Sequence, residues 1–276
     1  ETDSSQLACI CAIFSKRTLR PVKARLSRKD DILLTGKRHD FVAKYEVGYN
    51  DEGIIQGIEI DLAARCGYSL DLSKAIVSRA LFHADNTYFI PNATFKGFLC
   101  KTNTASNTAF RGFGGPQGML TIENIIEEIA NNMGTDPLNI RQVNYYQKES
   151  NNVTPYDQVI EDNIIEEITN ELIEDSNYLS RRKEVDLFNK KNQFLKKGLS
   201  FSPVKFGISF TTQLLNQAGA LVSIYKDGSI YINHGGTEMG QGLFIKVAQV
   251  VANEFGVDIS RVKVSATSTA KVPNTS

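Results

Sequence analysis

The chain has 276 residues, 41% of them hydrophobic, and its 31 basic and 31 acidic side chains give a formal net charge of zero. This length suffices for one large domain or two of ordinary size, each with a proper core. The balanced charge argues against a nucleic-acid or membrane-surface role based on bulk electrostatics. No apolar run approaches the ~20 residues of a membrane helix. We therefore expect neither nucleic acid nor membrane as a partner.

The cysteines and histidines are few and scattered. The spacing of the cysteines fits no zinc or CxxC redox pattern, and the histidines lie too far apart in sequence to predict a metal site. Scattered cysteines in a large neutral chain indicate buried thiols in a reducing compartment, which we expect to be the cytoplasm, with the peroxisome as an alternative. The cysteines are Cys9, Cys11, Cys66 and Cys100.

Periodicity predicts most elements of the first half of the chain. Small and apolar residues at helical spacing predict a helix over residues 2–15, capped by Asp3 or Ser4. The other elements expected here are a short strand (21–26), a hairpin (41–48 and 54–66), a loop running into a helix (68–79), a strand (94–101) and a helix (119–132) that ends at Gly134.

A glycine-rich stretch, residues 107–119, is the feature around which the chain is organised. Its glycines allow positive φ and a close approach of the backbone to a ligand, and Pro116 suits the first position of a helix. Because a helix start favours anions, this loop and Arg111 predict an anion site, with Phe113 pushed out of the turn. The alternative is an ordinary glycine-rich turn with a surface arginine, and spacing alone does not decide between them.

The second half of the chain begins with a change of composition. Residues 148–156 are polar and rich in turn formers, which indicates a domain boundary or a long surface loop. The elements expected beyond it are helices (157–173 and 177–194), strands (208–212 and 219–234, the latter containing an Asp-Gly hairpin turn), a helix (243–254) and a final strand (261–265).

A second glycine-rich turn, His234–Gly242, leads from a predicted strand into a predicted helix. Two such turns in one chain strengthen the interpretation of an anion cradle. Neither turn has the Lys-Ser/Thr ending of a phosphate-binding P-loop, and neither matches GxGxxG with an acidic residue ~20 positions later. A dinucleotide site is therefore disfavoured.

These stretches resemble a known family. Lys101–Asn103 together with Ser106–Met119 resembles the molybdopterin-cofactor motif of the xanthine dehydrogenase/aldehyde oxidase family, and His234–Gly242 resembles its second cofactor loop. Further matching stretches, in the same order as in the family, are Arg79–His83, Phe206–Thr211, Asn216–Ala220 and Val272–Ser276. The resemblance covers essentially the whole chain. It implies an α+β fold of two elongated mixed α/β molybdopterin-binding domains, incomplete at both ends, within residues 1–146 and 147–276.

The resemblance also implies a molybdenum–molybdopterin cofactor. In this family the metal is held by the dithiolene sulfurs of a pyranopterin, so no side chain need be a direct ligand, although Arg111 is expected near molybdenum. Arg111 is expected to donate to an oxygen on the metal or to the cofactor, and Gln241 to contact the pterin. The backbone of Phe110, Met239 and Gly240 is expected to supply further hydrogen bonds.

The substrate residues are likewise implied by the resemblance. Phe113 and Phe210 correspond to two rings that sandwich a planar heteroaromatic substrate, whereas the alternative for each is plain core packing. Catalytic roles fall to Arg79, which stabilises negative charge on the substrate, and to Glu1, which hydrogen-bonds the purine. The alternative for Arg79 is a solvated helix residue. Further pocket positions are Leu72, Thr211 and Leu215.

Glu1 and Arg79 favour a purine hydroxylase, because aldehyde-oxidising relatives usually carry apolar residues there. The resemblance implies oxidation of hypoxanthine to xanthine and of xanthine to urate, with oxygen derived from water. Electrons would pass through 2Fe–2S clusters and FAD, outside this chain, to NAD or O2, in a homodimer. The alternatives are an aldehyde oxidase paralogue, a non-catalytic domain and a nucleotide-binding module. Because the general-base glutamate of the family is expected beyond Ser276, we expect the isolated chain to bind no molybdenum cofactor tightly and to be inactive.

Overall fold

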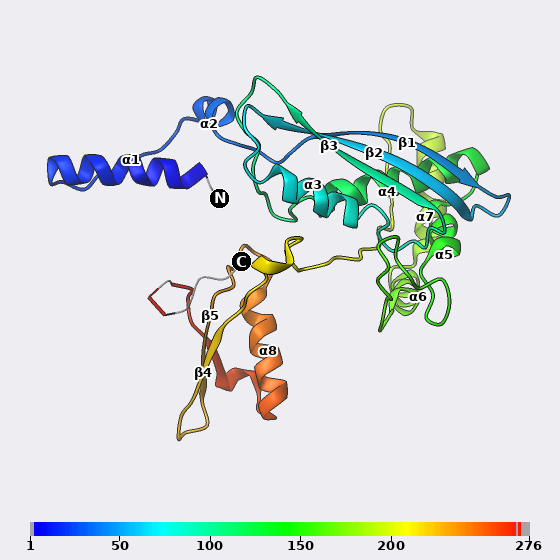
Figure 1. Ribbon diagram of the computed structural model, residues 1–276. Coiled ribbons are helices and arrows are strands. Elements are labelled where there is room, and N and C mark those ends of the chain that lie inside the picture. Colours follow the sequence, from blue (N-terminus) through cyan, green and yellow to red (C-terminus); the bar gives the residue numbers. More distant parts are fainter. Residues whose placement is uncertain (1–2, 269, 272–276) are drawn as a thin grey trace. The chain divides into compact units, whose positions relative to one another are not determined.

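The computed structural model describes residues 3–268 and 270–271. The chain forms two compact units, residues 1–207 and residues 208–276, and each unit has its own three-stranded sheet (Figure 1). Both units mix helices with strands, which confirms the expected α+β class. No helix in the described part of the chain is long and apolar enough to cross a membrane.

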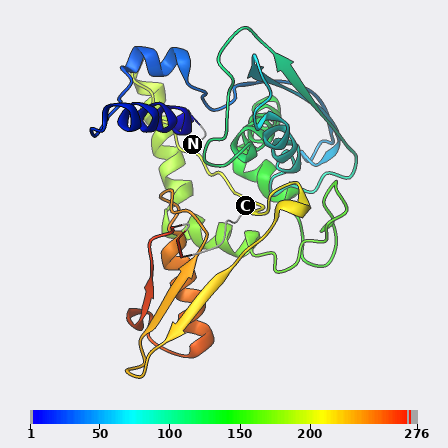
Figure 2. The same ribbon diagram turned by 60° about the vertical axis from the view of Figure 1, so that its left-hand side comes forward.

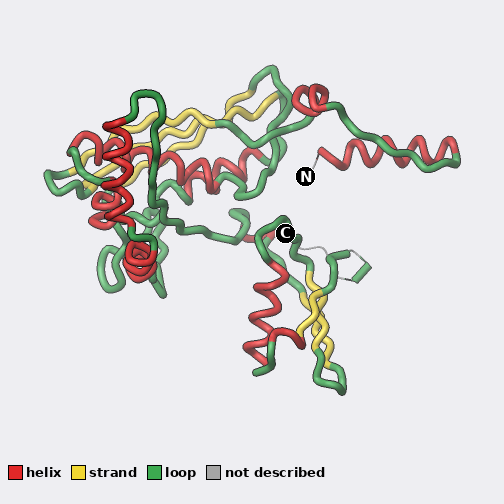
Figure 3. The backbone as a smooth tube through the Cα atoms, turned by 180° about the vertical axis from the view of Figure 1, so that it is seen from behind, coloured by secondary structure: helices red, strands yellow, loops and turns green. Residues whose placement is uncertain are grey.

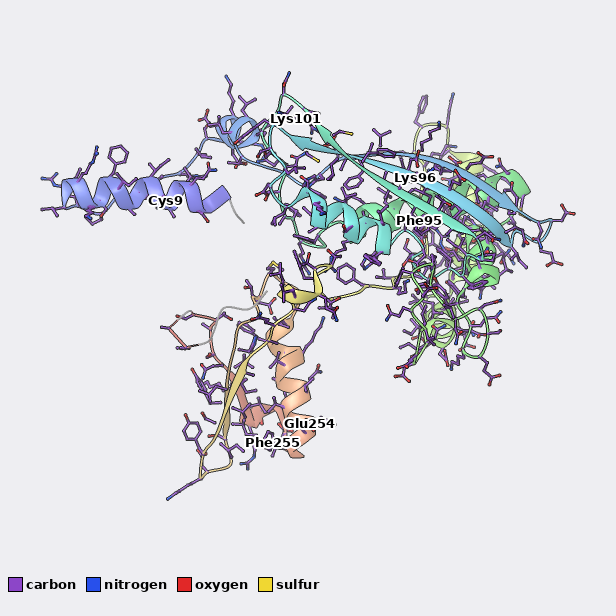
Figure 4. All side chains as sticks on the ribbon, viewed as in Figure 1. Cys9, Phe95, Lys96, Lys101, Glu254 and Phe255 are labelled. Atoms are coloured by element: carbon purple, nitrogen blue, oxygen red, sulfur yellow. The ribbon has the colours of Figure 1, made fainter. Side chains whose placement is uncertain are left out.

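In the first unit, β1 (Phe41–Tyr49) and β2 (Ile55–Gly67) pair antiparallel, and β3 (Ala93–Lys101) pairs parallel to β2. The chain crosses from β2 to β3 through α3 (Ser73–Phe82). Over the first four residues of β3 burial alternates, so that Phe95 packs against the core while Lys96 is exposed (Figure 4). The other helices of this unit are α1 (Asp3–Thr18), α2 (Arg28–Leu34), α4 (Gly115–Met133), α5 (Pro137–Asn144), α6 (Ile165–Asp175) and α7 (Tyr178–Lys191).

The core of the first unit lies between the sheet and the helices α3 and α4, which run along one face of the sheet (Figure 3). Isoleucines recur on α4 at helical spacing and are fully buried against residues of β2. They are Ile122, Ile125, Ile126 and Ile129. The same packing that buries these side chains fixes where the N-terminus of α4 lies relative to α3.

The second unit repeats the order of the first in smaller form. β4 (Ala220–Ile224) and β5 (Ile230–His234) form a hairpin, α8 (Leu243–Phe255) follows, and β6 (Val262–Val264) pairs parallel to β5. Helix α8 lies beside this sheet (Figure 2). Two short 3₁₀ segments, η1 (Gln213–Leu215) and η2 (Ile259–Arg261), complete the unit.

Several expectations are confirmed and several are wrong. The first helix, the long hairpin, the strand at 94–101, the helix ending at Gly134 and the final strand are present with bounds shifted by at most a few residues. The strand expected at 21–26 is absent, because this exposed stretch has no strand to pair with. The strand expected at 208–212 is also absent, and η1 follows instead.

Two further corrections concern helices. The helix expected from residue 157 starts only at Ile165, because Asp157 and Asp162 have φ of 62° and 49°, outside the helical region. Helix α5 was not expected, although Asp136 caps it by accepting from the N–H of Leu138 and Pro137 occupies its first turn.

The expectation of buried thiols is wrong for most of the cysteines. Cys66 is buried in the core of the first unit, but Cys9 on α1 (Figure 4) and Cys100 on β3 are exposed, and Cys11 is half-buried. Scattered cysteines in the sequence therefore did not indicate burial.

Candidate cofactor and substrate site

The first glycine-rich loop turns sharply at three consecutive residues with positive φ. The φ angles are 94° at Gly112, 50° at Phe113 and 97° at Gly114. Glycine adopts this region without strain, whereas phenylalanine does so only at a cost, which is typical of functional turns. The loop leaves the end of β3 at Lys101 (Figure 4) and ends where α4 begins at Gly115. The positive φ of the glycines and a helix that begins next to Pro116 both agree with the prediction made from the sequence.

Two glycines let α4 cross α3 with backbone against backbone. A Cβ on Gly114 would overlap the carbonyl oxygen of Ile76, and a Cβ on Gly118 would overlap that of Ala80. This close crossing brings Phe113 beside Arg79 of α3, whose guanidinium carbon lies 5.8 Å from the centre of the Phe113 ring. The helix pair therefore places two of the predicted substrate residues together.

Arg79 is buried, with 6% of its surface exposed, so the alternative of a solvated helix residue is wrong. Its Nη1 donates to the carbonyl oxygen of Gly207, and its guanidinium also lies 5.4 Å from the centre of the Phe206 ring. Burial lowers the pKa of Arg79 from its ordinary value. An arginine nevertheless stays charged in proteins, so a fixed cation lies here among aromatic rings.

Arg38, which was not predicted, anchors the base of this loop. Its Nη2 donates to the carbonyl oxygen of Arg111 at 2.6 Å, and its guanidinium stacks 4.3 Å from the centre of the Phe110 ring. The Arg111 side chain and the Phe110 ring are both exposed. Arg38 thus holds the loop by its backbone, and the Arg111 side chain is exposed.

The N–H groups at the start of α4 are used within the loop. Gly115 donates to Gly112 at 3.0 Å, and Gln117 and Gly118 both donate to Gly114. These amides are therefore not directed at an anion as the pattern had led us to expect. The cationic group exposed on this loop is the Arg111 side chain.

The second glycine-rich loop is held by the side chain of Glu238. Its carboxylate accepts from the N–H of Gly240 at 2.7 Å, Gly242 at 3.1 Å and Phe244 at 3.3 Å. Loss of hydration acts to raise the pKa of Glu238, but the N–H groups of Phe244, Gly240, Gly242 and Leu243 outweigh it and hold this pKa below its usual value. A carboxylate of the chain itself thus occupies the positive end of α8.

The Gln241 side chain also stabilises this loop through two hydrogen bonds to its backbone. Its Oε1 accepts from the N–H of Met239 at 2.6 Å, and its Nε2 donates to the carbonyl oxygen of Thr237 at 2.8 Å. A glutamine amide has two donor hydrogens and two acceptor lone pairs, so each end keeps capacity for one more bond. The roles of Gln241, Met239 and Gly240 in cofactor binding stay predictions.

Phe210 is fixed through its backbone by Asn216. The N–H of Phe210 donates to Asn216 Oδ1 and its carbonyl oxygen accepts from Asn216 Nδ2, both at 2.7 Å. This double hydrogen bond satisfies both backbone polar groups of Phe210 through a side chain, although residues 208–212 form no strand. Thr211 is half-buried and Leu215, in η1, is exposed.

The predicted site residues fall into three groups. Arg79 and Phe113 are in contact within the first unit, and the half-buried Leu72 precedes α3 in that unit. Phe210, Thr211 and Leu215 belong to the second unit. Glu1 and the Val272–Ser276 stretch lie outside the described residues. That the three groups line one substrate pocket stays a prediction.

Sequence reasoning assigned no role to three residues that support the site: Arg38, His83 and Phe206. His83 and Phe206 lay inside stretches that matched the family, but nothing in the spacing said what they contact. Their contacts join positions more than 70 residues apart, and local periodicity carries no information at that separation. Within residues 3–268 and 270–271, no group of three or more His, Cys, Asp or Glu side chains could hold a metal ion.

Comparison with known proteins identifies the family. Two sequence models, both described as the molybdopterin cofactor-binding domain, match residues 2–145 and 171–276. The chain belongs to this family. The two matches leave residue 1 and residues 146–170 uncovered, and the predicted domain boundary at 146–147 falls at the start of the second of these stretches. The boundary itself stays a prediction, since the compact units divide elsewhere.

Several proteins of known name that resemble the whole chain are xanthine dehydrogenases. Over 100% of this chain the identity is 48% to xanthine dehydrogenase of Dictyostelium discoideum, 47% to xanthine dehydrogenase 1 of Arabidopsis thaliana and 45% to xanthine dehydrogenase/oxidase of Gallus gallus. The chain spans 20% of the length of each of these relatives.

Solved structures agree with the fold. The chain is similar to quinoline 2-oxidoreductase from Pseudomonas putida 86, with a TM-score of 0.71 and 20% identity, over 94% of this chain and 34% of that one. It is also similar to the aldehyde oxidoreductase from Desulfovibrio gigas, with a TM-score of 0.66 and 21% identity, over 90% and 27% of the two chains. At such identities the similarity establishes the fold alone.

The residues of the two loops fit a molybdopterin cofactor. Arg111 offers an exposed guanidinium, which suits an oxygen or phosphate target. At Gly242, where φ is 74°, no atom lies within 4 Å of the position that a Cβ would take, although the Gly242 N–H itself is bound by Glu238. Gln241 can add one donor and one acceptor.

Proposed function

We propose that this chain is part of a molybdenum-dependent hydroxylase of the xanthine dehydrogenase type that oxidises hypoxanthine to xanthine and xanthine to urate. The observation that carries the proposal is identity of 45–48% over the whole chain to several xanthine dehydrogenases, together with two molybdopterin cofactor-binding domains. When bound, the molybdenum cofactor supplies the oxygen-transfer and two-electron redox chemistry. The chain supplies cofactor and substrate binding.

The cofactor would be held by the two glycine-rich loops. Arg111 would donate to an oxygen near molybdenum, and the free capacity of the Gln241 amide would be used by the pterin. The backbone of Phe110, Met239 and Gly240 would add hydrogen bonds. The anchoring of the Arg111 backbone by Arg38 supports this assignment, because it fixes the loop that carries the Arg111 side chain.

The substrate would lie flat between Phe113 and Phe210, with Leu72, Thr211 and Leu215 as further pocket residues and Glu1 hydrogen-bonded to the purine edge. Arg79 would meet the negative charge that develops on the ring as oxygen is added. Its buried position supports this role, because a fixed cation in a low-dielectric site stabilises developing charge more strongly than one in water.

The remaining partners follow from the same proposal. Electrons would leave through 2Fe–2S clusters and FAD in other parts of the protein to NAD or O2, the enzyme would be a homodimer, and it would work in the cytoplasm. These statements rest on the resemblance to the xanthine dehydrogenase/aldehyde oxidase family, and the chain spans a fifth of the length of the relatives it matches.

The deciding experiment is a comparison of substrates with the full-length protein purified with its cofactor. We expect molybdenum at close to one atom per subunit and a kcat/KM for hypoxanthine and xanthine well above that for aromatic aldehydes. Stoichiometric molybdenum with a preference for aldehydes would replace the proposal by the aldehyde oxidase alternative. Absence of molybdenum from the purified protein, despite an intact fold, would indicate a non-catalytic domain.

A further inference from the structure

The C-terminal end of α3 is closed by the imidazole ring of His83. The last carbonyl groups of a helix lack intrahelical donors and must find other partners. His83 Nδ1 lies 2.8 Å from the carbonyl oxygen of Arg79, one turn earlier, while the His83 N–H donates to Ala80. The ring therefore caps the carbonyl of the residue that we propose as the substrate arginine.

The second nitrogen of the ring fixes the protonation state of His83. The N–H of Gly207 donates to His83 Nε2 at 2.9 Å, so Nε2 acts as an acceptor and carries no proton. In a neutral imidazole the other nitrogen then bears the hydrogen, and Nδ1–H donates to the Arg79 carbonyl.

A third hydrogen bond closes a circuit that we call the histidine clasp, made of Arg79, His83 and Gly207. The carbonyl oxygen of Gly207, whose N–H is held by His83, accepts from Nη1 of Arg79. His83 thus links the backbone of Arg79 to the group that holds the guanidinium of Arg79. The His83 ring also packs on Phe206, with centroids 4.9 Å apart, and Phe206 contacts Arg79.

The segment that carries Gly207 is fixed independently at its other end. The N–H of Lys205 donates to Asn86 Oδ1 at 3.0 Å, and Asn86 Nδ2 donates to the carbonyl oxygen of Pro203 at 2.9 Å. The Lys205 side chain forms an ion pair with the buried Asp85. The last step, from Lys205 to Gly207, is bonded to the end of α3 through His83 and through the Arg79 side chain.

We propose that His83 is a positioning residue for Arg79. In the neutral form it holds Gly207 so that the carbonyl of Gly207 orients the Arg79 guanidinium over the face of Phe113. This inference rests on the proposed function for its effect on purine turnover, but the clasp itself is a property of the first unit.

The surroundings of His83 favour the neutral ring. Burial, chiefly, and the positive charges of Arg79 and Lys205 lower the pKa of His83. No carboxylate is among the groups that shift this pKa, and two acidic groups of the same unit are paired elsewhere: Asp85 with Lys205 and Tyr146, and Glu123 of α4 with Arg141. Protonation would place a second N–H opposite the N–H of Gly207 and open the clasp.

The test is a double-mutant cycle in the full-length protein, built from His83→Phe and Arg79→Met. Phenylalanine keeps a ring against Phe206 and removes both nitrogens. We expect His83→Phe to lower kcat and kcat/KM for xanthine together, by about ten- to a hundredfold, because Arg79 acts in the transition state and is now misplaced. In the Arg79→Met background the same change should alter the rate by less than twofold. Equal factors in both backgrounds, or no effect in the wild type, overturn the proposal.

A second pair of variants leaves His83 in place. Gly207→Pro removes the N–H that His83 accepts, whereas Gly207→Ala keeps it and adds a Cβ at an ordinary 3.8 Å from the His83 ring. We expect the proline variant to reproduce the loss of His83→Phe and the alanine variant to lose clearly less. Equal losses in the two variants contradict the clasp.

The unfolding temperatures of the two single variants and the double variant are also measured in the cofactor-free protein. Because this measurement does not depend on purine turnover, it tests the clasp separately from the proposed function. Coupling between His83 and Arg79 in the unfolding temperature supports the clasp even if the wild-type protein oxidises no purine. Strict additivity of the two changes in unfolding temperature overturns it.

Discussion

At the scale of single residues, the decisive feature is that Arg79 is buried between two aromatic rings and hydrogen-bonded to a backbone carbonyl. An arginine so placed has lost much of its hydration and side-chain freedom, which is expected of a group that acts on a ligand rather than on solvent. The sequence named this residue through resemblance, but only packing distinguished it from the surface arginines of the chain.

Arg79→Met should lower kcat/KM for xanthine by about 10²–10³, the usual loss when one donor to developing charge is removed. The cost to the free energy of unfolding should be only about 1 kcal/mol, because the Gly207 carbonyl loses one donor. Steady-state kinetics and thermal unfolding of the full-length variant measure the two effects.

The matched control is Arg65→Met, which removes an exposed arginine paired with Asp40 at 2.8 Å. A surface pair of this kind contributes ~0–1 kcal/mol, and neither kinetics nor unfolding should change much. If Arg79→Met kept purine kinetics as close to normal as Arg65→Met, Arg79 would have no role in the reaction.

At the scale of elements, α4 requires glycine for two different reasons: a positive φ at its ends, and the absence of a Cβ where it crosses α3. Gly114 needs both a positive φ and the absence of a Cβ, Gly118 needs only the absence of a Cβ, and Gly134, with φ of 65° and nothing within 4 Å, needs only the positive φ. Substitutions at these three positions in α4 and at its two ends therefore measure the cost of backbone strain and the cost of steric overlap separately.

Gly118→Ala should destabilise the protein by about 1–3 kcal/mol through overlap with the Ala80 carbonyl, and Gly134→Ala by about 1–2 kcal/mol through strain in the left-handed region. Gly114→Ala combines both and should cost about 3 kcal/mol or more. Denaturant unfolding of the three variants gives the order. A loss at Gly114 no larger than that at Gly134 would mean that α4 shifts away from α3 at little cost.

The stability of the loop before α8 depends on the charge of Glu238, whose carboxylate accepts from several backbone N–H groups. Because the N–H groups around Glu238 hold its pKa below the ordinary 4.5, this carboxylate stabilises the folded loop at pH values above 4.5 and the stabilisation is lost as the pH falls through the lower folded pKa. Acidification should therefore loosen residues 238–244.

Glu238→Gln tests this dependence. At pH 7 the variant should exchange the amide hydrogens of residues 238–244 faster than the wild type, because a neutral amide accepts more weakly from several N–H groups than a carboxylate does. At pH values below the lowered pKa of Glu238 the two proteins should converge, since protonated Glu238 is then neutral as well. Hydrogen-exchange mass spectrometry measures both; a difference that persists unchanged at low pH would rule out the charge as its cause.

At the scale of the whole molecule, the two units repeat one order of elements: a hairpin, a helix and a strand parallel to the second strand of the hairpin. The glycine-rich stretches lie where a strand gives way to a helix, before α4 in one unit and before α8 in the other. Turns, caps and alternation are local signals, so the sequence predicted these hairpins and helix ends closely.

Local signals also misled where a partner was needed. Residues 21–26 and 208–212 alternate like strands, but a strand exists only if another strand pairs with it, and that is decided elsewhere in the chain. In the second case Asn216 supplies the backbone bonds that a neighbouring strand would have supplied.

The sequence by itself determined the family, the two glycine-rich loops and the residue types available to hold a cofactor, because these reside in contiguous stretches. Only the tertiary structure decided that Arg79 is buried, that Arg38 grips the Arg111 backbone and that His83 links α3 to Gly207. The physical reason is distance along the chain: a contact between residues more than 70 positions apart depends on the packing of entire helices, which no local pattern of residues encodes.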